Sequence, residues 1–425
     1  MKRLPFSNIR NIVLVFCIVL LSGGIGYRLG QKDPGALRQA IGSRSVPQNT
    51  QTPSTVRADF SLFWDVWGRM FRYFYDAKNL DPQKMLYGAI SGMVAAGDDP
   101  YTSFLPPQEN KEFKEDIGGS FQGIGAQLGL KEGRVIIVAP LKGSPAEKMG
   151  VRPSDIILEV NGEETYGWSV DQAVGKIRGK KGTTVTLSIL HDTDTKPTEI
   201  TIVRDEIIVP SVDSWIKSIS DITELSGLHT TLPLTTYIGY IALSRFGDRT
   251  QDEWDSAVSE IVSAYKAGTI PGLVFDLRNN PGGYLDMAVS IASEFIKSGT
   301  IVTQQSSDGT KDPYSVNRLG KLTDIPLVVL INKGSASAAE IVAGALKDYK
   351  RAKIVGETSF GKGSVQTPQE LTGGASLHVT TAEWLTPNGS WIHKKGITPD
   401  VEVKMEDYEA TKDAQLEKAI ELLLQ

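Results

Sequence analysis

One local pattern, which occurs twice, most constrains the fold of this chain: a run of apolar residues, then a glycine-containing turn and a helix. Residues 273–277 (Leu-Val-Phe-Asp-Leu) precede such a turn and an expected helix over residues 284–296. Residues 327–331 (Leu-Val-Val-Leu-Ile) begin the second copy. Repeated strand–turn–helix units predict an α/β fold, which we place at residues 207–406, and an amphipathic helix is expected at residues 407–425.

The first 57 residues differ in composition from the rest of the chain. Lys2, Arg3 and Arg10 precede an uncharged stretch at residues 11–27, which is typical of a signal sequence or signal anchor; a buried core helix is the alternative. Seventeen uncharged residues are close to the short limit for a membrane span, and Ser22-Gly23-Gly24, within this stretch, is only a weak cleavage site.

We therefore predict a retained transmembrane anchor at residues 1–30, which places the protein in the cell membrane as a single-pass protein. The remainder would then be extracytoplasmic, either periplasmic or extracellular. Residues 31–57 are polar, rich in Ser, Thr, Gln, Pro and Gly, and lack apolar periodicity, so they are expected to be a linker.

Composition narrows the classes of scaffold and partner. A net charge of −5 and a pI near 5.6 give no reason to expect nucleic acid as a partner. Cys17 is the only cysteine, which excludes an intramolecular disulfide. No clustered set of His, Cys, Asp and Glu is visible in the sequence, so we expect neither a metal nor a cofactor.

Two regions lie between the linker and the α/β core. Residues 58–115 are expected to be an N-terminal helical region, with apolar side chains at helical spacing that pack in a core or at a dimer contact. Residues 116–206 are expected to be a separate β-rich unit, in which Ser169 and Gln172 form a capping box for a helix. Its strands are predicted at residues 134–138, 156–160, 185–190 and 199–203.

The β-rich unit resembles a PDZ domain. The resemblance lies in the loop Phe121-Gln122-Gly123-Ile124-Gly125-Ala126 and in the later segments at 143–146, 155–157 and 160–162. Glycines let successive backbone N–H groups converge on one anion, and a neighbouring strand edge pairs with an extended peptide. The resemblance implies that a peptide C-terminus binds at four residues, whereas a tight turn alone is the alternative. These residues are Gly123, Ile124, Gly125 and Ala126.

A candidate nucleophile lies in the second turn, at Lys333-Gly334-Ser335-Ala336-Ser337-Ala338-Ala339-Glu340. Ser337 and Glu340 match a capping box, so one interpretation of Ser337 is a helix N-cap. The other interpretation is catalysis, because the free N–H groups at a helix N-terminus stabilise a developing oxyanion. The small neighbouring residues would also let a peptide approach.

A serine nucleophile requires a base. The chain has four histidines, and none lies at a strand end beside a turn motif, so a Ser-His-Asp triad is poorly supported. Lys362 lies between Gly361 and Gly363 and beside an aromatic residue, where it can be packed and desolvated. Desolvation lowers the pKa of an amine, which can then act as a base. A solvated Gly-Lys-Gly loop is the alternative.

Together, Ser337, Lys362 and Gln366 resemble the catalytic set of the C-terminal processing peptidases, also called tail-specific proteases. Lys362 follows Ser337 by 25 residues and Gln366 follows Lys362 by four, as in that family, and this spacing selects Ser337 over Ser335. Residues 276–283 (Asp-Leu-Arg-Asn-Asn-Pro-Gly-Gly) and 396–400 match two further family motifs. The resemblance runs from about residue 60 to the C-terminus, and Ala339 departs from it where many relatives have a serine.

The resemblance implies a ClpP/crotonase-like protease core and a serine endopeptidase that cuts proteins at or near their C-terminal tails. Ser337 Oγ would attack the scissile carbonyl, Lys362 would take and return the proton, and Gln366 would orient Lys362. The backbone N–H groups of Gly283 and Ala338 would form the oxyanion hole. Neither a metal nor a cofactor is needed for this chemistry.

The family also suggests regulation and partners. Arg178 matches an arginine proposed to couple the position of the PDZ domain to protease activity; an exposed arginine at a helix end is the alternative. The expected partners are protein substrates, held through their C-terminal tails, and the membrane through the N-terminal segment. A homo-oligomer formed through the terminal helices is a further expectation.

Two other function classes stay open. A non-catalytic PDZ adaptor with a protease-like core is disfavoured by the joint presence of Ser337, Lys362 and Gln366. A crotonase-type acyl-CoA enzyme shares a related α/β core, but a PDZ unit and an export signal do not suit a cytosolic enzyme of that type.

Overall fold

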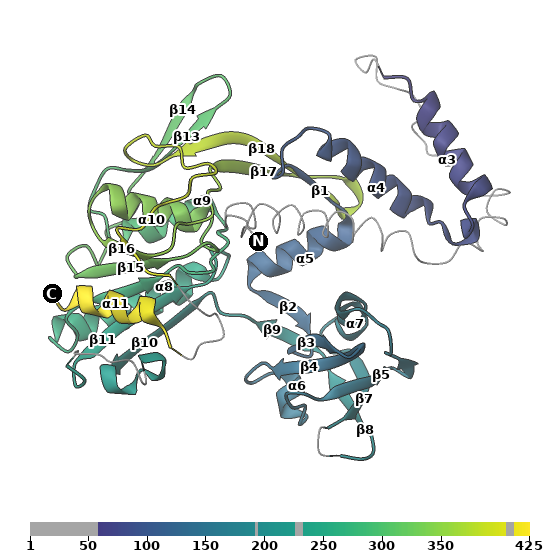
Figure 1. Cartoon of the computed structure of the whole chain (residues 1–425), viewed down its shortest axis with the longest axis horizontal. Coiled ribbons are helices and arrows are strands. Elements are labelled where there is room, and N and C mark those ends of the chain that lie inside the picture. The colour runs from purple at the N-terminus through teal and green to yellow at the C-terminus, as the bar shows by residue number, and fades with distance from the viewer. Residues whose placement is uncertain (1–57, 192–193, 226–232, 405–411) are drawn as a thin grey trace, which may run out of the picture. The chain divides into compact units, whose positions relative to one another are not determined.

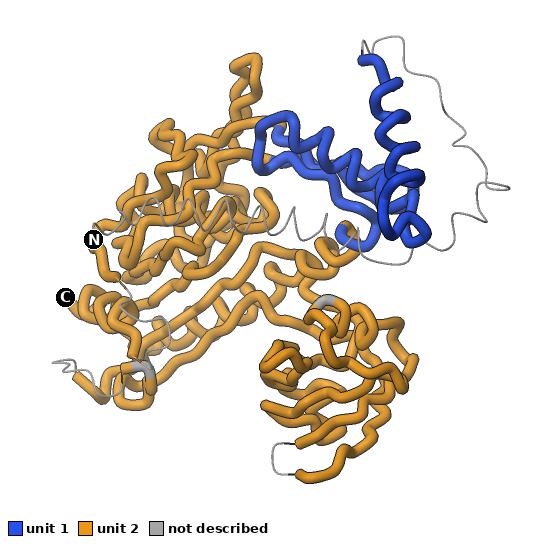
Figure 2. The backbone as a smooth tube through the Cα atoms, turned by 45° about the vertical axis from the view of Figure 1, so that its right-hand side comes forward, with its two compact units in different colours: residues 1–109, 366–380 blue, residues 110–365, 381–425 orange. Residues whose placement is uncertain are grey.

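The computed structural model describes residues 58–191, 194–225, 233–404 and 412–425. The chain divides into two compact units, which Figure 2 colours separately. The first unit comprises residues 1–109 and 366–380, and the second comprises residues 110–365 and 381–425.

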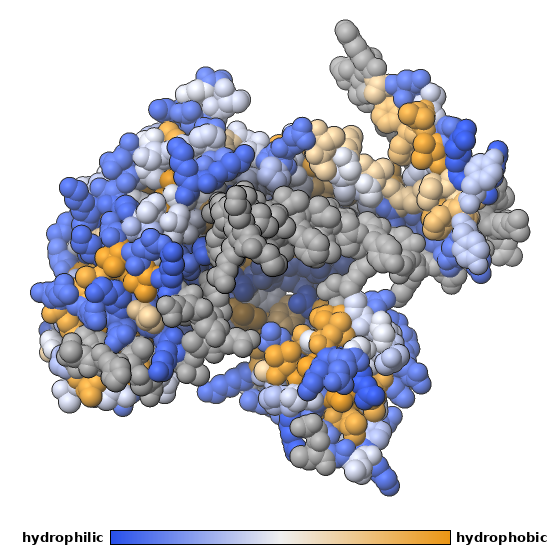
Figure 3. Space-filling model, in the orientation of Figure 1, coloured by the Kyte–Doolittle hydropathy of each residue, from blue (hydrophilic) through white to orange (hydrophobic). Residues whose placement is uncertain are grey.

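The first unit contains two helices and a short strand pairing. Helix α3 (Ser61–Tyr73) has no fully buried residue, and apolar side chains gather along it in Figure 3. Helix α4 (Pro82–Ala95) begins after Asp81, whose carboxylate accepts hydrogen bonds from two backbone N–H groups of the first turn. Strand β1 (Ser103–Leu105) pairs antiparallel with the first residues of β18 (Ser376–Leu385). Helix α5 (Pro107–Gly118) leads from this unit into the second.

A six-stranded sheet forms the centre of the α/β part of the second unit (Figure 1). Its order is β10-β11-β12-β15-β16-β19, and neighbours run parallel except for β10, which is antiparallel to β11. The strands β12 and β15 are buried at every position, as expected for parallel strands covered on both faces. The six strands are β10 (Val212–Ser218), β11 (Tyr237–Leu243), β12 (Leu273–Asp276), β15 (Leu327–Ile331), β16 (Lys353–Gly356) and β19 (Val401–Glu402).

Successive residues of these strands enter two different hydrophobic cores. Leu273 and Phe275 pack in the core that contains helices α8, α9 and α10, whereas Val274 packs in the core that contains α11. The sheet is therefore covered on both faces, and the predicted α/β class is confirmed. The four helices are α8 (Thr250–Lys266), α9 (Leu285–Ser293), α10 (Ala338–Asp348) and α11 (Ala414–Leu423).

A small antiparallel β domain precedes this sheet in the chain and has a hydrophobic core of its own. Its strand order is β3-β4-β5-β7-β8, which leaves β3 at an edge, and the two-residue strand β6 (Glu163–Glu164) pairs with β5. The capping box predicted for Ser169 and Gln172 is present at the start of helix α7 (Val170–Ile177). The strands are β3 (Ala126–Lys131), β4 (Arg134–Pro140), β5 (Ile156–Val160), β7 (Thr184–Leu190) and β8 (Thr198–Val203).

Short pairings complete the second unit. Strand β2 (Ser120–Gly123) pairs antiparallel with β9 (Asp205–Ile208) where the chain enters and leaves the β domain. Strand β13 (Thr300–Ser306) pairs with β14 (Lys311–Ser315) and with the last residues of β18.

The prediction of a single-pass membrane protein is wrong, because no helix among the residues that the structure describes is long and apolar enough to cross a membrane. The longest helix in this part of the chain, α8, has 17 residues and carries Asp252, Glu253 and Lys266, whereas a span requires about 20 mostly apolar residues. The predicted anchor at residues 1–30 and the linker at residues 31–57 themselves lie outside the described residues.

Candidate active site

Ser337 occupies the turn between β15 and α10 in an unusual backbone conformation. Its φ of 53° and ψ of −115° lie outside the regions that residues with a side chain prefer. Strained residues of this kind cluster at functional sites, and nucleophilic serines are known on sharp strand-to-helix turns. Ser337 is also only half-buried, so a reactant can approach it.

Ser335, the other serine of this turn, has its hydroxyl group occupied by the fold. It is fully buried, and its Oγ donates to the carbonyl oxygen of Leu277 at 2.8 Å and accepts from the N–H of Asn332 at 3.0 Å. A hydroxyl that uses its single proton inside the core is not placed to attack a substrate. The contacts of Ser335 therefore agree with the choice of Ser337.

The carboxylate of Glu340 joins the turn of Ser337 to the loop of Lys362. Its Oε2 accepts hydrogen bonds from the backbone N–H groups of Ser337 (2.8 Å) and Lys362 (2.9 Å), and its Oε1 accepts from the N–H of Gly361 and the hydroxyl of Ser359, both at 2.6 Å. Glu340 is fully buried, and this burial raises its pKa although the four hydrogen bonds oppose the shift. One buried carboxylate thus holds two segments of the backbone together.

The sequence predicted Glu340 only as the capping partner of Ser337 and not as a partner of the Lys362 loop. The available signal was that Glu340 is a charged residue in the first turn of an otherwise apolar helix. A charged residue that is buried in such a helix usually has several hydrogen-bond partners. The loop partners of Glu340 lie 19 to 22 residues further along the chain, so no local pattern identifies them.

The loop that carries Lys362 is packed against its neighbours. The indole Nε1 of Trp384 donates to the carbonyl oxygen of Lys362 at 2.9 Å, and that of Trp391 donates to the carbonyl oxygen of Gly363 at 3.0 Å. A Cβ on Gly363 would lie 2.8 Å from the backbone nitrogen of His393, so only glycine fits there. These contacts argue against the solvated Gly-Lys-Gly loop, and Lys362 itself is half-buried.

Gly282 and Gly283 bring the backbone against the turn of Ser337. A Cβ on Gly282 would lie 2.8 Å from the Cβ of Ser337 and 3.0 Å from the backbone nitrogen of Ala338, the first residue of α10. Phe246 bonds to the two neighbours of Gly283, by donating to the carbonyl of Gly282 (2.9 Å) and accepting from the N–H of Tyr284 (2.8 Å). Phe246 and Gly283 thus form a parallel β-bridge, in which Phe246 bonds to the residues on either side of Gly283. The N–H of Gly283 itself therefore points away from Phe246.

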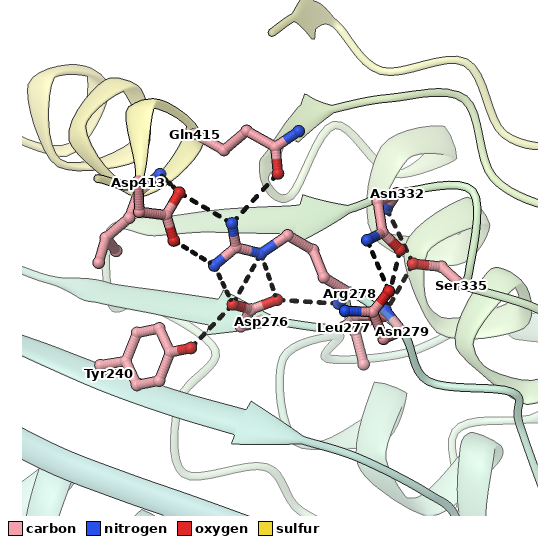
Figure 4. Close-up of polar contacts among 10 residues, drawn as sticks. Tyr240, Asp276, Leu277, Arg278, Asn279, Asn332, Ser335, Asp413 and Gln415 are labelled. Carbon is pink, nitrogen blue, oxygen red and sulfur yellow. Dashed lines mark hydrogen bonds and ion pairs between the residues drawn. The ribbon is translucent and has the colours of Figure 1, made fainter. Parts of the chain in front are cut away.

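Asparagines and a buried ion pair hold the segment before these glycines (Figure 4). The backbone N–H of Asn279 donates to Asn332 Oδ1, and Asn332 Nδ2 donates back to Asn279 Oδ1, each at 2.9 Å. Arg278 Nη2 lies 2.6 Å from Asp276 Oδ2 and 2.7 Å from Asp413 Oδ2. Asp413 caps α11, so this ion pair links the end of β12 to the C-terminal helix.

The structure places the five predicted catalytic and oxyanion-hole residues in two groups. Ser337, Ala338, Gly283 and Lys362 belong to the second unit, where the contacts above bring their segments together. Gln366 lies in strand β17 (Ser364–Glu370) and belongs to the first unit, where its Nε2 donates to Thr380 Oγ1 at 3.1 Å. In the described part of the chain, no group of three or more His, Cys, Asp or Glu side chains could hold a metal ion.

The predicted peptide-binding loop lies between β2 and the edge strand β3. Ile124 is buried and its carbonyl accepts a hydrogen bond from the N–H of Ala146, while Gly125 has a φ of 74°. A Cβ on Gly125 would lie 2.5 Å from the Cβ of Ser144, so glycine is required there. Ala126 begins β3, which pairs with β4 on one side and contacts helix α7.

Arg178 follows the last residue of α7 and contacts two groups outside that helix. Its guanidinium carbon lies 4.6 Å from the centre of the Phe121 ring, and its Nη1 lies 3.3 Å from Glu115 Oε2 in α5. Its side chain is 36% exposed, so these contacts are open to competition by solvent. Arg178 therefore packs against Phe121, at the start of the predicted peptide-binding loop, and pairs with Glu115 of α5. The alternative of an exposed arginine at a helix end did not include these contacts.

Comparisons with known proteins agree with this organisation. Residues 237–403 match peptidase family S41, and residues 136–190 match the PDZ domain family. The chain is similar to the carboxy-terminal processing protease CtpA of Bacillus subtilis, with 41% identity over 329 residues, which are 77% of this chain and 66% of CtpA. It is also similar to CtpB of the same organism, with 37% identity over 381 residues, which are 88% of this chain and 75% of CtpB.

Among solved structures, the crystal structure of an S41 protease from Bacteroides fragilis has the same fold, with a TM-score of 0.51 and 17% sequence identity. The match covers 90% of this chain and 98% of that one. An α/β core with a PDZ domain and these relatives define a serine peptidase. The chain belongs to peptidase family S41, and it spans just under two thirds of the length of CtpA. The family resemblance, the fold class and the enzyme class predicted from the sequence are thereby confirmed.

Proposed function

We propose that this chain is a serine endopeptidase with a Ser337–Lys362 dyad that cuts proteins at or near their C-terminal tails. The observation that carries the proposal is the carboxylate of Glu340, which accepts hydrogen bonds from the backbone N–H groups of both residues. A strained nucleophile and a packed lysine loop that are held by one buried group form a preorganised site.

In the proposed reaction the hydroxyl oxygen of Ser337 attacks the scissile carbonyl, and Lys362 accepts the hydroxyl proton. Lys362 then gives this proton to the leaving amine, so that an acyl-enzyme forms and water later hydrolyses it. Gln366, four residues after Lys362, orients the lysine by accepting a hydrogen bond through its amide oxygen. The N–H groups of Gly283 and Ala338 stabilise the tetrahedral oxyanion, an effect commonly worth about 3 kcal/mol per donor.

The packing at Gly282 supports this oxyanion hole. Without a side chain there, the segment that ends at Gly283 can approach the Cβ of Ser337 and the N–H of Ala338. The N–H of Gly283 points away from Phe246, so it does not bond to that residue. Two backbone donors on rigid elements cost little reorganisation when charge develops on the carbonyl oxygen.

The PDZ domain is proposed to bind the C-terminus of the protein substrate through Gly123, Ile124, Gly125 and Ala126. Supporting this, Gly125 has a positive φ beside an edge strand, a geometry in which backbone N–H groups can face a carboxylate. An extended peptide would add to the edge of β3 as a further strand, because that edge lies opposite the pairing with β4.

We also propose that Arg178 couples the position of the PDZ domain to catalysis through its contacts with Phe121 and Glu115. The functional parts follow the boundaries expected from the sequence, with the helical region at 58–115, the PDZ domain at 116–206, the protease core at 207–406 and the terminal helix at 407–425. Copies of the chain associate through the terminal helices.

The test compares the full chain with its Ser337→Ala and Lys362→Ala variants on an unfolded protein that has an apolar C-terminus. Cleavage is followed by mass spectrometry, and Ser259→Ala, at an exposed position of α8, is the control for the removal of a serine hydroxyl. Cleavage by the parent chain and by Ser259→Ala alone is the expected result. Cleavage by all four chains would show that the dyad is wrong, and amidation of the substrate's C-terminus tests the role of the PDZ domain.

A further inference from the structure

The backbone of Phe246 is the immediate support of Gly283. It donates to the carbonyl oxygen of Gly282 at 2.9 Å and accepts from the N–H of Tyr284 at 2.8 Å. A Cβ on Gly283 would overlap the carbonyl group of Phe246, so the two backbones are in direct contact. A displacement of Phe246 must therefore displace Gly283 and turn the N–H of that glycine.

Phe246 lies in a tight turn that is held by the hydroxyl of Thr250, the first residue of α8. Thr250 is fully buried, and its Oγ1 accepts a hydrogen bond from the N–H of Gly247 at 2.9 Å. The same oxygen lies 3.1 Å from the carbonyl oxygen of Arg245, to which it can donate. Thr250 thus bonds to the residues on both sides of Phe246, and its hydroxyl fixes the place of Phe246 in the turn.

Ser211 joins this turn to the segment that leaves the small β domain. Its Oγ lies 3.0 Å from Thr250 Oγ1 and donates to Glu253 Oε2 at 2.8 Å. A hydroxyl has one proton, and a carboxylate can only accept, so Ser211 Oγ accepts from Thr250. The N–H of Ser211 also donates to Glu253 Oε2, at 2.7 Å, which anchors this serine. Because Ser211 follows the last residue of β9 by three positions, the two hydroxyls connect the end of that strand with the turn of Phe246.

We propose that Thr250 and Ser211 are positioning residues of the oxyanion hole, which fix the direction of the Gly283 N–H through the backbone of Phe246. This inference rests on the proposed function, in which the N–H of Gly283 stabilises the tetrahedral oxyanion. Both hydroxyl-bearing residues are buried, so neither contacts a substrate. A misdirected oxyanion donor weakens binding of the transition state and leaves binding of the substrate unchanged.

Conservative substitutions separate this role from packing. Thr250→Val keeps the shape of the side chain and removes the acceptor for the N–H of Gly247, whereas Thr250→Ser keeps the hydroxyl. Ser211→Ala removes the hydroxyl that accepts from Thr250. Ile261→Val is the control for a loss of stability, because it removes one buried methylene about three turns further along the same helix.

The experiment measures kcat and KM of the full chain for an unfolded protein substrate, and the inhibition constant of a tripeptide aldehyde with apolar side chains. The adduct of an aldehyde with a serine nucleophile carries an oxygen in the oxyanion position, so its affinity reports on the oxyanion donors. Thr250→Val is expected to lower kcat about tenfold and to weaken the inhibitor about as much with KM unchanged, a part of the roughly 100-fold loss for a deleted donor. Ser211→Ala should change kcat and inhibition in the same direction, whereas Thr250→Ser and Ile261→Val should keep the parent values.

The outcomes separate this inference from the proposed function. A Thr250→Val chain that is folded by circular dichroism and keeps the parent kcat and inhibition constant would overturn the role of the hydroxyls. Equal losses of kcat in Thr250→Val and Ile261→Val would overturn it as well, since reduced stability would then be the cause. Where Thr250→Val does not fold, Ser211→Ala decides, and an unchanged kcat in that chain would overturn the inference. An active Ser337→Ala chain, measured beside the others, would instead overturn the proposed function and this inference with it.

Discussion

The backbone N–H of Lys362 donates to Glu340 Oε2 at 2.9 Å, and the same oxygen accepts the N–H of Ser337 at 2.8 Å. The proposed base and the proposed nucleophile are therefore held by a single buried atom. A carboxylate suits this position because it has two oxygens and no proton to donate, so it can accept from four donors at once. The backbone N–H of Phe360 also donates to the carbonyl oxygen of Ser335 at 2.9 Å, so this bond and Glu340 together join the two loops.

Replacement of Glu340 by glutamine is expected to reduce activity strongly although the shape is kept. The NH2 group of glutamine would face N–H or O–H donors on one side of the site, which leaves buried donors unsatisfied at a cost of about 3 kcal/mol. We expect kcat/KM to fall by about 100-fold, since 1.4 kcal/mol corresponds to tenfold. Glu260→Gln, at an exposed position of α8, is the control, and equal activity of both variants would contradict the role assigned to Glu340.

The stability of the protein should carry a pH dependence from the same residue. Burial raises the pKa of Glu340 above its ordinary value of 4.5, so the folded chain holds this proton more tightly than the unfolded chain. The contribution of Glu340 to the free energy of unfolding is therefore largest below pH 4.5 and decreases as the pH rises through the raised pKa. Urea unfolding of the parent chain and of Glu340→Gln at stepped pH should show their difference in free energy decrease with rising pH. A difference that increases would show that the shift has the opposite sign.

Gly282 is expected to tolerate no side chain. A Cβ there would lie 2.8 Å from the Cβ of Ser337 and 2.9 Å from the carbonyl oxygen of Ala336, so Gly282→Ala must push the oxyanion segment away from the nucleophile. The loss of one oxyanion donor typically costs about 100-fold or more in kcat, and we expect a loss of that size. Gly92→Ala, in α4, meets no atom within 4 Å and should be active and no less stable. Full activity of Gly282→Ala would argue against this oxyanion hole.

The sequence predicted those features that local patterns determine. The strand–turn–helix units at β12–α9 and β15–α10 are recognisable because each combines a short apolar run with a glycine-containing turn. The capping box at Ser169 and the position of Ser337 between strand and helix also follow from neighbours in the chain.

The contacts that hold the site together were not predictable in the same way. Glu340 meets Gly361 and Lys362 only after two segments more than 20 residues apart have packed, and no periodicity records that packing. Arg278 pairs with Asp413 over 135 residues. The spacing shared with the family identified the proposed reacting residues. The hydrogen bonds and ion pairs that hold those residues in place could be found only in the folded structure.

The ion pair of Arg278 should contribute far more stability than an exposed pair of similar length. Arg278 contacts Asp276 and Asp413, and all three side chains are at most 15% exposed, so Arg278→Met would leave two carboxylates buried without a cation. We expect the free energy of unfolding to fall by about 3–5 kcal/mol, as measured when one partner of a buried pair is removed. The control is Lys297→Met, which breaks a 2.7 Å pair with Asp324 whose side chains are 67% and 77% exposed, and it should cost less than about 1 kcal/mol. Urea unfolding of both variants measures these losses in the free energy of unfolding. Similar losses for Arg278→Met and Lys297→Met would mean that the ion pair between β12 and α11 is no stronger than a surface pair.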